Sequence, residues 1–233
     1  MNNLEILIKV KEGLNKLDSL DYDNMECWQI FNAFNKVQKG WVRKQLHGYN
    51  ARKQGDEASK FSIDDLQVLL VEVPLNASKQ VKYYETDLLP NNYVYWKRVL
   101  ADTKMKCCPP RALRIHLTEM ANVEDMLDDD SKRPSAEWGE TFATLIGNRI
   151  RIYTNDEFDI QNVKLIYYRL PVDVTQVGCV DLTTGDPATA DVQCEFKNDI
   201  AEILVDETIA LLAGNIESIN EYQINKTSVV EKT

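Results

Sequence analysis

Few side chains in the sequence combine a type and a spacing that could support chemistry. The chain has two histidines, His47 and His116, and neither belongs to a Cys-x-x-Cys or His-Glu-x-x-His pattern, so the sequence predicts no zinc site. We expect His47 to stand at the end of a helix, where a cation is favoured beside the exposed carbonyl groups. His116 falls on the polar side of a predicted strand and is interpreted as a surface residue. We therefore expect no metal and no cofactor.

The acidic sequence "DDDS" at 128–131 gathers carboxylates, whose oxygens suit calcium or magnesium. It lacks the alternating spacing and the glycine of a calcium-binding loop, so we predict a solvated acidic turn instead. The sequence also contains no glycine-rich phosphate-binding motif and no serine nucleophile elbow. These features favour binding or assembly, and we predict no catalytic residues and no enzymatic activity. An enzyme of a class without such motifs is the remote alternative.

Aromatic and basic residues alternate in the central part of the chain. The aromatic ones are Tyr83, Tyr84, Tyr93, Tyr95, Trp96, Tyr167 and Tyr168, and the basic ones are Lys82, Lys97, Arg98 and Arg169. Such interleaving can form a stacking platform for single-stranded nucleic acid. It can equally belong to a sheet that packs one face inward and presents tyrosines at an interface. We favour the core or interface interpretation.

The composition is that of a soluble globular protein. The chain of 233 residues has room for one large domain or two small ones, and its hydrophobic fraction of 44% is enough for an ordinary core. No run approaches the ~20 apolar residues that a membrane span needs, and the N-terminus reads as a short amphipathic helix without a signal peptide. The five cysteines are odd in number and scattered, which favours reduced thiols in a protein made in a cytoplasm.

The net charge of −10 is distributed unevenly. Segment 36–60 holds seven basic residues and two acidic ones, whereas segment 195–221 holds seven acidic residues and one lysine. An acidic balance disfavours simple wrapping of DNA, because neutralising phosphates requires a basic surface. Polarised charge suits a protein whose surfaces meet across subunits, although two ordinary solvated faces would give the same pattern.

Local patterns predict an α+β fold with N-terminal helices, a central and mostly antiparallel β-rich body, and a long C-terminal helix. The helical part is expected at 1–73, the β-rich part at 79–193 and the C-terminal helix at 195–221. The alternation of Leu113, Ile115 and Leu117 predicts one strand with a polar face. We interpret residues 1–222 as a single domain and 223–233 as a tail.

The C-terminal helix carries apolar residues on two sides. One set is typical of a face packed on a core: Phe196, Ile200, Ile203, Leu204 and Leu211. The second set is predicted to point the opposite way and to form a subunit interface: Val205, Ile209, Leu212, Ile216 and Ile219. A break at Gly214-Asn215, which would let both sets face one core from separate short helices, is the alternative.

Three segments resemble virion proteins of the crAss-like tailed bacteriophages. They are "FNKVQKGWVRKQLHG" at 34–48, "LLPNNYVYWKRV" at 88–99 and "FKNDIAEILVDETIALLAGNIESINEYQ" at 196–223. The resemblance is to the neck proteins that stack as rings below the portal, also called head–tail connector proteins. It covers about a quarter of the chain, and its motifs are structural rather than catalytic.

The resemblance implies a virion protein, made in the cytoplasm of a bacterial host, that forms a cyclic ring of twelve copies. Its implied partners are copies of itself, the portal protein and other neck or tail ring proteins. Viral DNA would pass through the channel without sequence-specific binding. No membrane is implied as a partner.

The polar loop at 48–59 and the preceding helix are expected to contact a neighbour through charge. The residues assigned to this contact are Arg43, Lys44, Arg52 and Lys53. Pairs of exposed charges give small energies and mainly fix register. The alternative function is a nucleic-acid-binding accessory protein that uses the basic segment 36–60.

Overall fold

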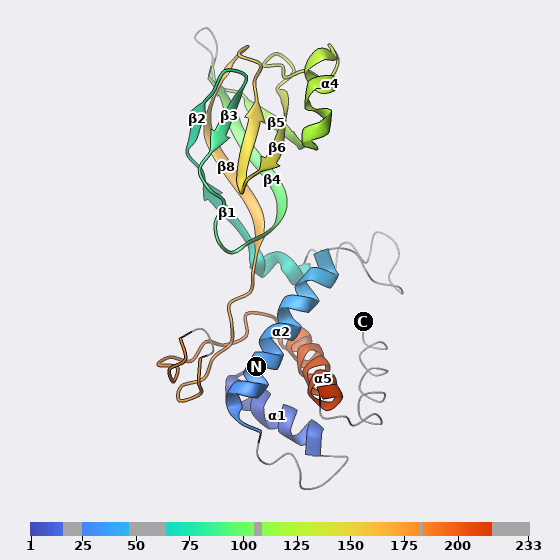
Figure 1. Ribbon diagram of the computed structural model, residues 1–233, viewed down its shortest axis with the longest axis vertical. Coiled ribbons are helices and arrows are strands. Elements are labelled where there is room, and N and C mark those ends of the chain that lie inside the picture. The colour runs from blue at the N-terminus through green and yellow to red at the C-terminus, as the bar shows by residue number, and fades with distance from the viewer. Residues whose placement is uncertain (16–24, 47–63, 105–108, 182–183, 216–233) are drawn as a thin grey trace. The chain divides into compact units, whose positions relative to one another are not determined.

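The computed structural model describes residues 1–15, 25–46, 64–104, 109–181 and 184–215 (Figure 1). The chain divides into two compact units, which we call the helical unit and the sheet unit. The sheet unit is continuous, from Leu70 to Leu170, whereas the helical unit combines residues 1–69 with residues 171–233. The expectation of one domain over 1–222 stays a prediction, and we describe each unit by itself.

The sheet unit is one curled sheet of eight strands (Figure 1). Its spatial order is β1-β8-β4-β5-β6-β7-β3-β2, and every pair is antiparallel except β5–β6, which is parallel. The strands are β1 (Leu70–Pro74), β2 (Ala77–Lys79), β3 (Tyr83–Thr86), β4 (Tyr93–Lys104), β5 (Ala112–Leu117), β6 (Glu140–Ile146), β7 (Arg149–Tyr153) and β8 (Asp159–Arg169).

The two edge strands of this sheet, β1 and β2, follow each other in the chain. Only Leu75 and Asn76 separate them, yet β1 pairs with β8 and β2 pairs with β3 at the opposite edge. The Leu75 amide still donates to the Val163 carbonyl at 2.9 Å, and the Asn76 carbonyl accepts from the Asp87 amide at 3.0 Å. The bend therefore carries the chain from one edge to the other, which requires the sheet to curl.

Alternation along the strands fills the inside of the curl. In β5 the buried residues are Leu113 and Ile115, and in β7 they include Ile150 and Ile152. Leu117, which the sequence pattern assigned to the same face, is 45% exposed where β5 ends. Gly147 and Asn148 join β6 to β7 with φ of 56° and 60°, the left-handed pair that a two-residue type I′ hairpin requires.

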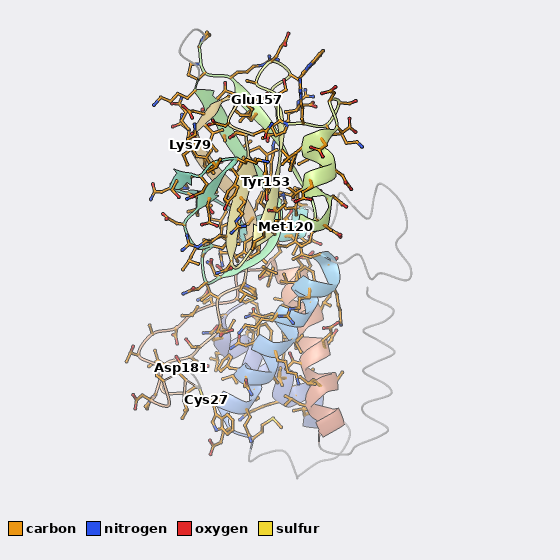
Figure 2. All side chains as sticks on the ribbon, turned by 45° about the horizontal axis from the view of Figure 1, so that its top comes forward. Cys27, Lys79, Met120, Tyr153, Glu157 and Asp181 are labelled. Atoms are coloured by element: carbon orange, nitrogen blue, oxygen red, sulfur yellow. A yellow bond between two sulfur atoms is a disulfide. The ribbon has the colours of Figure 1, made fainter. Side chains whose placement is uncertain are left out.

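The parallel pair β5–β6 needs a crossover, because parallel neighbours cannot be joined by a tight turn. Residues 118–139 supply it and contain the 3₁₀ turn η2 (Met120–Asn122) and helix α4 (Val123–Asp128). Val123 of α4 packs with Phe142 and Tyr153 of the sheet in a small second core. Tyr153 also approaches the crossover through its hydroxyl, 3.6 Å from the Met120 sulfur (Figure 2).

The helical unit is built on α1 (Asn3–Asn15), α2 (Cys27–Leu46) and α5 (Asn198–Asn215), with the 3₁₀ turn η1 (Gln67–Leu69) before the sheet. Helix α5 contacts both α1 and α2, so its buried stripe is wide. The stripe recurs as adjacent pairs every four residues: Ile200, Ala201, Leu204, Val205, Thr208, Ile209, Leu212 and Ala213. Trp41 of α2 meets Phe196, just before α5, edge to face at 5.2 Å.

A strap, defined here as residues Pro171–Asp181, packs along α2 within the helical unit. The Asn35 side chain pairs with it like a neighbouring strand: its amide donates to the Val174 carbonyl at 3.0 Å, and its oxygen accepts from the Val174 amide at 2.8 Å. Gln38 donates to the Val172 carbonyl at 3.0 Å, and Lys39 forms an ion pair with Asp173. A row of polar side chains on α2 thus holds a segment more than 130 residues later in sequence.

A disulfide between Cys27 and Cys179 closes the same contact, with the two Cα atoms 5.8 Å apart. The expectation of reduced thiols is therefore wrong for these two cysteines. Their sequence separation of 152 residues hides the pairing, since only the folded chain brings α2 and the strap together. Cys194 is free, while Cys107 and Cys108 lie outside the described residues.

The expected fold class, α+β with a long N-terminal helical part, is wrong. The structure is mostly a curled, mixed eight-stranded sheet with a few helices, and in the described residues no N-terminal helical part reaches residue 73. Residues 64–66 are helical and lead into η1, and the chain is already extended at Leu70. The β-branched Val71 and Val73 favour a strand there. The β-rich body also contains a parallel pair. Helix α5 is described from Asn198 to Asn215, and residues 216–221 of the predicted C-terminal helix lie outside the described residues.

None of the helices in the described ranges has both the length and the apolar character required to span a bilayer.

We predict that Gly13 is required by the close approach of α1 to α5. A Cβ atom added at Gly13 would collide with the Ile209 side chain, whereas one added at Gly40 of α2 would meet nothing within 4 Å. Gly40→Ala should raise the free energy of unfolding by about 1 kcal/mol through helix propensity, and Gly13→Ala should lower it by about 1 kcal/mol or more. Chemical denaturation measures both.

Ile209→Val removes the colliding methyl group and provides the second half of a double-mutant cycle. In that background Gly13→Ala should become neutral or stabilising, with a coupling free energy of about 1–2 kcal/mol. If Gly13→Ala stabilises the wild-type chain as much as Gly40→Ala does, the close approach of the two helices is refuted.

Candidate functional site

The sheet unit contains an open groove of about 1320 Å³ beside the β5–β6 crossover. Its apolar surface comes from Phe142 of β6, Met126 of α4, Trp138, and Pro109 and Pro110 ahead of β5. The groove is also lined by charged residues, among them Arg111, Lys132, Arg133, Glu137, Glu140 and Glu157. We call this site the Trp138 groove; Figure 2 marks Glu157 on the sheet unit that carries it.

Trp138 is the most exposed aromatic residue of the sheet unit that the structure describes, with 76% of its surface accessible. Its turn is nevertheless fixed, because Ser135 and Glu140 exchange backbone hydrogen bonds of 2.9 and 3.1 Å across it. The Trp138 amide also points to the Ser135 hydroxyl at 3.3 Å. A large apolar side chain is therefore held in solvent by an ordered backbone.

Gly139 makes this turn possible. Its φ of +67° lies in the left-handed region, and an added Cβ would stand 3.3 Å from the Arg111 side chain and 3.4 Å from the Ala112 carbonyl. Arg111 packs there because its guanidinium donates to the Glu137 carbonyl. Arg111 and Gly139 thus hold the turn in this conformation.

The acidic run at 128–130 begins at the end of α4 and continues as a turn, of which Asp130 lines the groove. The Asp129 carboxylate accepts from the Ser131 amide at 2.9 Å and pairs with Lys132 at 3.0 Å, while Arg133 pairs with Asp130 at 3.1 Å. These ion pairs face solvent, so they order the turn more than they stabilise the fold. Within the described part of the chain, no three His, Cys, Asp or Glu residues are grouped as a metal site would need.

Hydrogen bonding lowers the pKa of Asp129 below its ordinary value of 3.8. The Ser131 backbone amide is the largest cause and the Lys132 ammonium the next, because both favour the charged carboxylate. A depressed carboxyl pKa contributes stability above the unfolded-state pKa and loses it as the pH falls through the folded-state pKa. The Asp129 carboxylate therefore contributes to the turn at neutral pH, and this contribution is lost in acid below 3.8.

The apolar residues predicted to form a subunit interface are placed differently by the structure. Val205, Ile209 and Leu212 are only 2%, 6% and 7% exposed, and they lie in the core of the helical unit under α1 and α2. They are therefore not available to another subunit. The two apolar sets of α5 merge into one wide stripe because two helices of the same chain cover it. Ile216 and Ile219 lie outside the described residues.

The charged residues predicted for the same interface are only partly described. Arg43 is exposed on α2, and Lys44 pairs with Glu207 of α5 at 2.9 Å within the unit. Arg52 and Lys53, like His47 and the whole loop at 48–59, lie outside the described residues. Since Lys39 and Lys44 are both paired internally, part of the basic segment 36–60 is occupied by the fold itself.

The aromatic residues of the strands are mainly core residues. Tyr84, Tyr167 and Tyr168 are at most 7% exposed, and Tyr167 donates to the Asn92 side chain at 2.9 Å. Burial raises the pKa of Tyr167 and Tyr168, as expected for phenols away from water. The core interpretation is confirmed for these three, while Tyr95 remains 44% exposed.

Sequence reasoning missed Trp138, although it placed His116 correctly on the polar side of β5, where it lines the groove. The available signal was the sequence "RPSAEWGE", in which one large aromatic residue stands in an otherwise polar turn between proline and glycine. Such a residue has no periodic partners that would bury it.

No protein-family model matches this sequence, and no curated protein matches it either.

We predict that Lys132→Met raises the pKa of Asp129 toward its ordinary value without fully restoring it, because the Ser131 amide remains in place. Arg133→Met is the matched control, since Arg133 pairs with Asp130 and should leave the Asp129 titration unchanged. Carboxyl-detected NMR titration of the full chain measures both. Equal shifts in the two variants would contradict the assigned partners.

Proposed function

We propose that this chain is a structural assembly protein whose sheet unit docks on another protein through the Trp138 groove. More specifically, we propose a subunit of the head–tail connector ring in the neck of a tailed bacteriophage. The observation that carries the proposal is a tryptophan that is 76% exposed on a hydrogen-bonded turn beside an open groove.

An exposed tryptophan of this kind suits a protein interface. Large aromatic side chains dominate the binding energy at interfaces, especially when their backbone is already ordered and little entropy is lost on binding. The groove supplies further apolar contact through the half-buried Met126. The ion pairs of Lys132 and Arg133 lie around it, as the polar rim of an interface does.

The particular assembly is proposed from the resemblance of segments 34–48, 88–99 and 196–223 to crAss-like phage neck proteins. In this proposal copies of the chain close into a ring, with twelve as the implied number. A closed ring uses a head-to-tail interface, in which the Trp138 groove of one subunit meets a different surface of the next. The portal and other neck proteins would contact the faces of the ring, and the protein would reside in the virion.

The composition is compatible with a channel that binds the passing DNA only weakly. With a net charge of −10 the chain offers little general attraction to phosphates. A genome that must slide through a ring is served better by weak, sequence-independent contacts than by specific ones.

We predict that the isolated protein binds duplex DNA no more tightly than about 10⁻⁴ M at physiological salt, the weak end of non-specific binding, and without sequence preference. Fluorescence anisotropy with two unrelated duplexes measures this. Submicromolar, sequence-selective binding would instead favour a nucleic-acid-binding accessory protein that uses segment 36–60.

We also predict that Trp138→Ala prevents assembly while the chain stays folded, because the side chain is exposed and supports no core. The loss should be about 2 kcal/mol or more, or roughly thirtyfold in the dissociation constant. Leu88→Ala, which truncates a residue that is 58% exposed in the same unit, is the matched control and should assemble normally. Sedimentation over a concentration series, with electron microscopy of the particles, gives the readout.

Cyclic particles from the wild-type chain that disappear in Trp138→Ala would support the proposal. A wild-type chain that stays monomeric at every concentration and in the presence of a phage portal would refute it. Unchanged assembly of Trp138→Ala would remove the groove from the interface.

A further inference from the structure

A second cavity, of about 380 Å³, lies within the helical unit against the Cys27–Cys179 disulfide. Helix α2 contributes Trp28, Phe31 and Asn32 to its wall, and the strap contributes Thr175 and Cys179. Figure 2 labels Cys27 and Asp181 in this unit, and Asp181 also lines the cavity. The assembly role proposed above does not use this cavity.

The two sulfurs of the disulfide have unequal surroundings. Cys179 lines the cavity and Cys27 does not, so a molecule inside the cavity lies beside Cys179; over the whole residue Cys179 is 7% exposed and Cys27 is half-buried. Cys27 is the first residue of α2, a helix of 20 residues. A thiolate at a helix N-terminus is stabilised by the unpaired amides and the helix dipole, which makes Cys27 the better leaving group. Exchange rates depend on both properties, the access to one sulfur and the leaving ability of the other.

We propose that this cavity is a thiol–disulfide exchange site for a low-molecular-weight thiol. The thiolate of the small molecule enters the cavity and attacks the Sγ atom of Cys179. The Cys27–Cys179 bond breaks, a new bond forms between Cys179 and the incoming sulfur, and the electron pair leaves on Cys27 as a thiolate. The number of disulfides is unchanged in this step, so no external oxidant or reductant is needed.

The product can proceed in two directions. Cys27 can attack the mixed disulfide at Cys179 and expel the small thiol, which restores the starting state. A second small thiol can attack instead, which releases the small molecule as its own disulfide and leaves both cysteines reduced. The pair is therefore a reversible modification site.

The strap should remain in place during exchange, so the reaction does not require unfolding. Asn35, Gln38 and Lys39 hold Val174, Val172 and Asp173 independently of the disulfide. Asn3 of α1 adds a hydrogen bond to the Thr175 carbonyl at 2.7 Å. These bonds keep the cavity wall intact while the sulfur–sulfur bond is exchanged.

The experiment uses the oxidised full-length chain and glutathione as the probe. Free thiols are first blocked with iodoacetamide, glutathione is added, and the reaction is quenched with acid and N-ethylmaleimide before peptide mass spectrometry. We expect glutathione on Cys179 and the maleimide on Cys27. Glutathione found on Cys27 with the maleimide on Cys179 would overturn the proposal.

A pair of variants at Asn32 tests the role of the cavity. Asn32 is exposed on α2, so Asn32→Trp should fill the cavity and slow exchange by about tenfold through loss of access to the sulfur. Asn32→Ala is the matched control, because it removes the same amide without filling the space, and it should react at least as fast as the wild type. Equal rates in all three proteins would refute the assignment.

The denaturant dependence of the rate separates local exchange from exchange in unfolded molecules. A rate that stays constant at low urea concentration is expected for attack through the cavity. The proposal would be overturned if the exchange rate rose in proportion to the fraction of unfolded molecules, and if the rate of Asn32→Trp changed only as its own unfolded fraction does. That result would mean that thiols cannot reach the disulfide in the folded protein.

Discussion

Helix α2 has two partners that the ribosome produces only after the whole sheet unit: the strap and α5. Its apolar residues, among them Phe34 and Trp41, are buried, and Trp41 packs against Phe196. In its polar row, the side-chain NH2 groups of Asn35 and Gln38 donate to strap carbonyls. Without residues 171–215, α1 and α2 would therefore expose apolar residues that belong in the core. They would also expose polar side chains whose spacing matches the backbone of the strap. The sheet unit is continuous in sequence, so it can form without this closure. The helical unit cannot form until residues 171–215 are present, because its contacts join segments far apart in sequence and such contacts form slowly.

The shape of the sheet unit depends on how its own strands are connected. Its strands curl because one bend joins the two edges, and the parallel pair β5–β6 forces a crossover that carries α4 and the turn of Trp138. The groove is thus a product of topology: a simple hairpin between β5 and β6 would leave no segment to form its wall. Gly139 and Arg111 then fix the turn locally, and so the exposed tryptophan stands on a turn that this chain orders by itself.

The sequence predicted those elements whose signal is local. Trp28, Phe31, Phe34, Val37, Trp41 and Val42 give α2 its period, and most of the strands follow from alternation or β-branched runs. It could not predict what covers α5, because residues such as Ile209 look like a second surface until α1 is placed against them. The residues just before Pro74 were wrongly predicted to be helical, because a continuous apolar segment fits a buried helix and a strand equally well. The disulfide and the parallel pairing depend on contacts between distant residues, and a lone exposed tryptophan has no period. For these reasons the fold class and the groove required the structure.

The bend at Leu75-Asn76 has a further consequence for how copies of this chain can meet. It leaves only short edge strands, five residues in β1 and three in β2, and β1 ends at a proline that has no amide to donate. Long, regular edges act as templates on which other chains add strands, and they lead to open-ended aggregation. Such abbreviated edges offer little backbone on which another chain could add a strand. Association between copies then has to be specified by side chains, whose shape and charge can select one partner and one geometry.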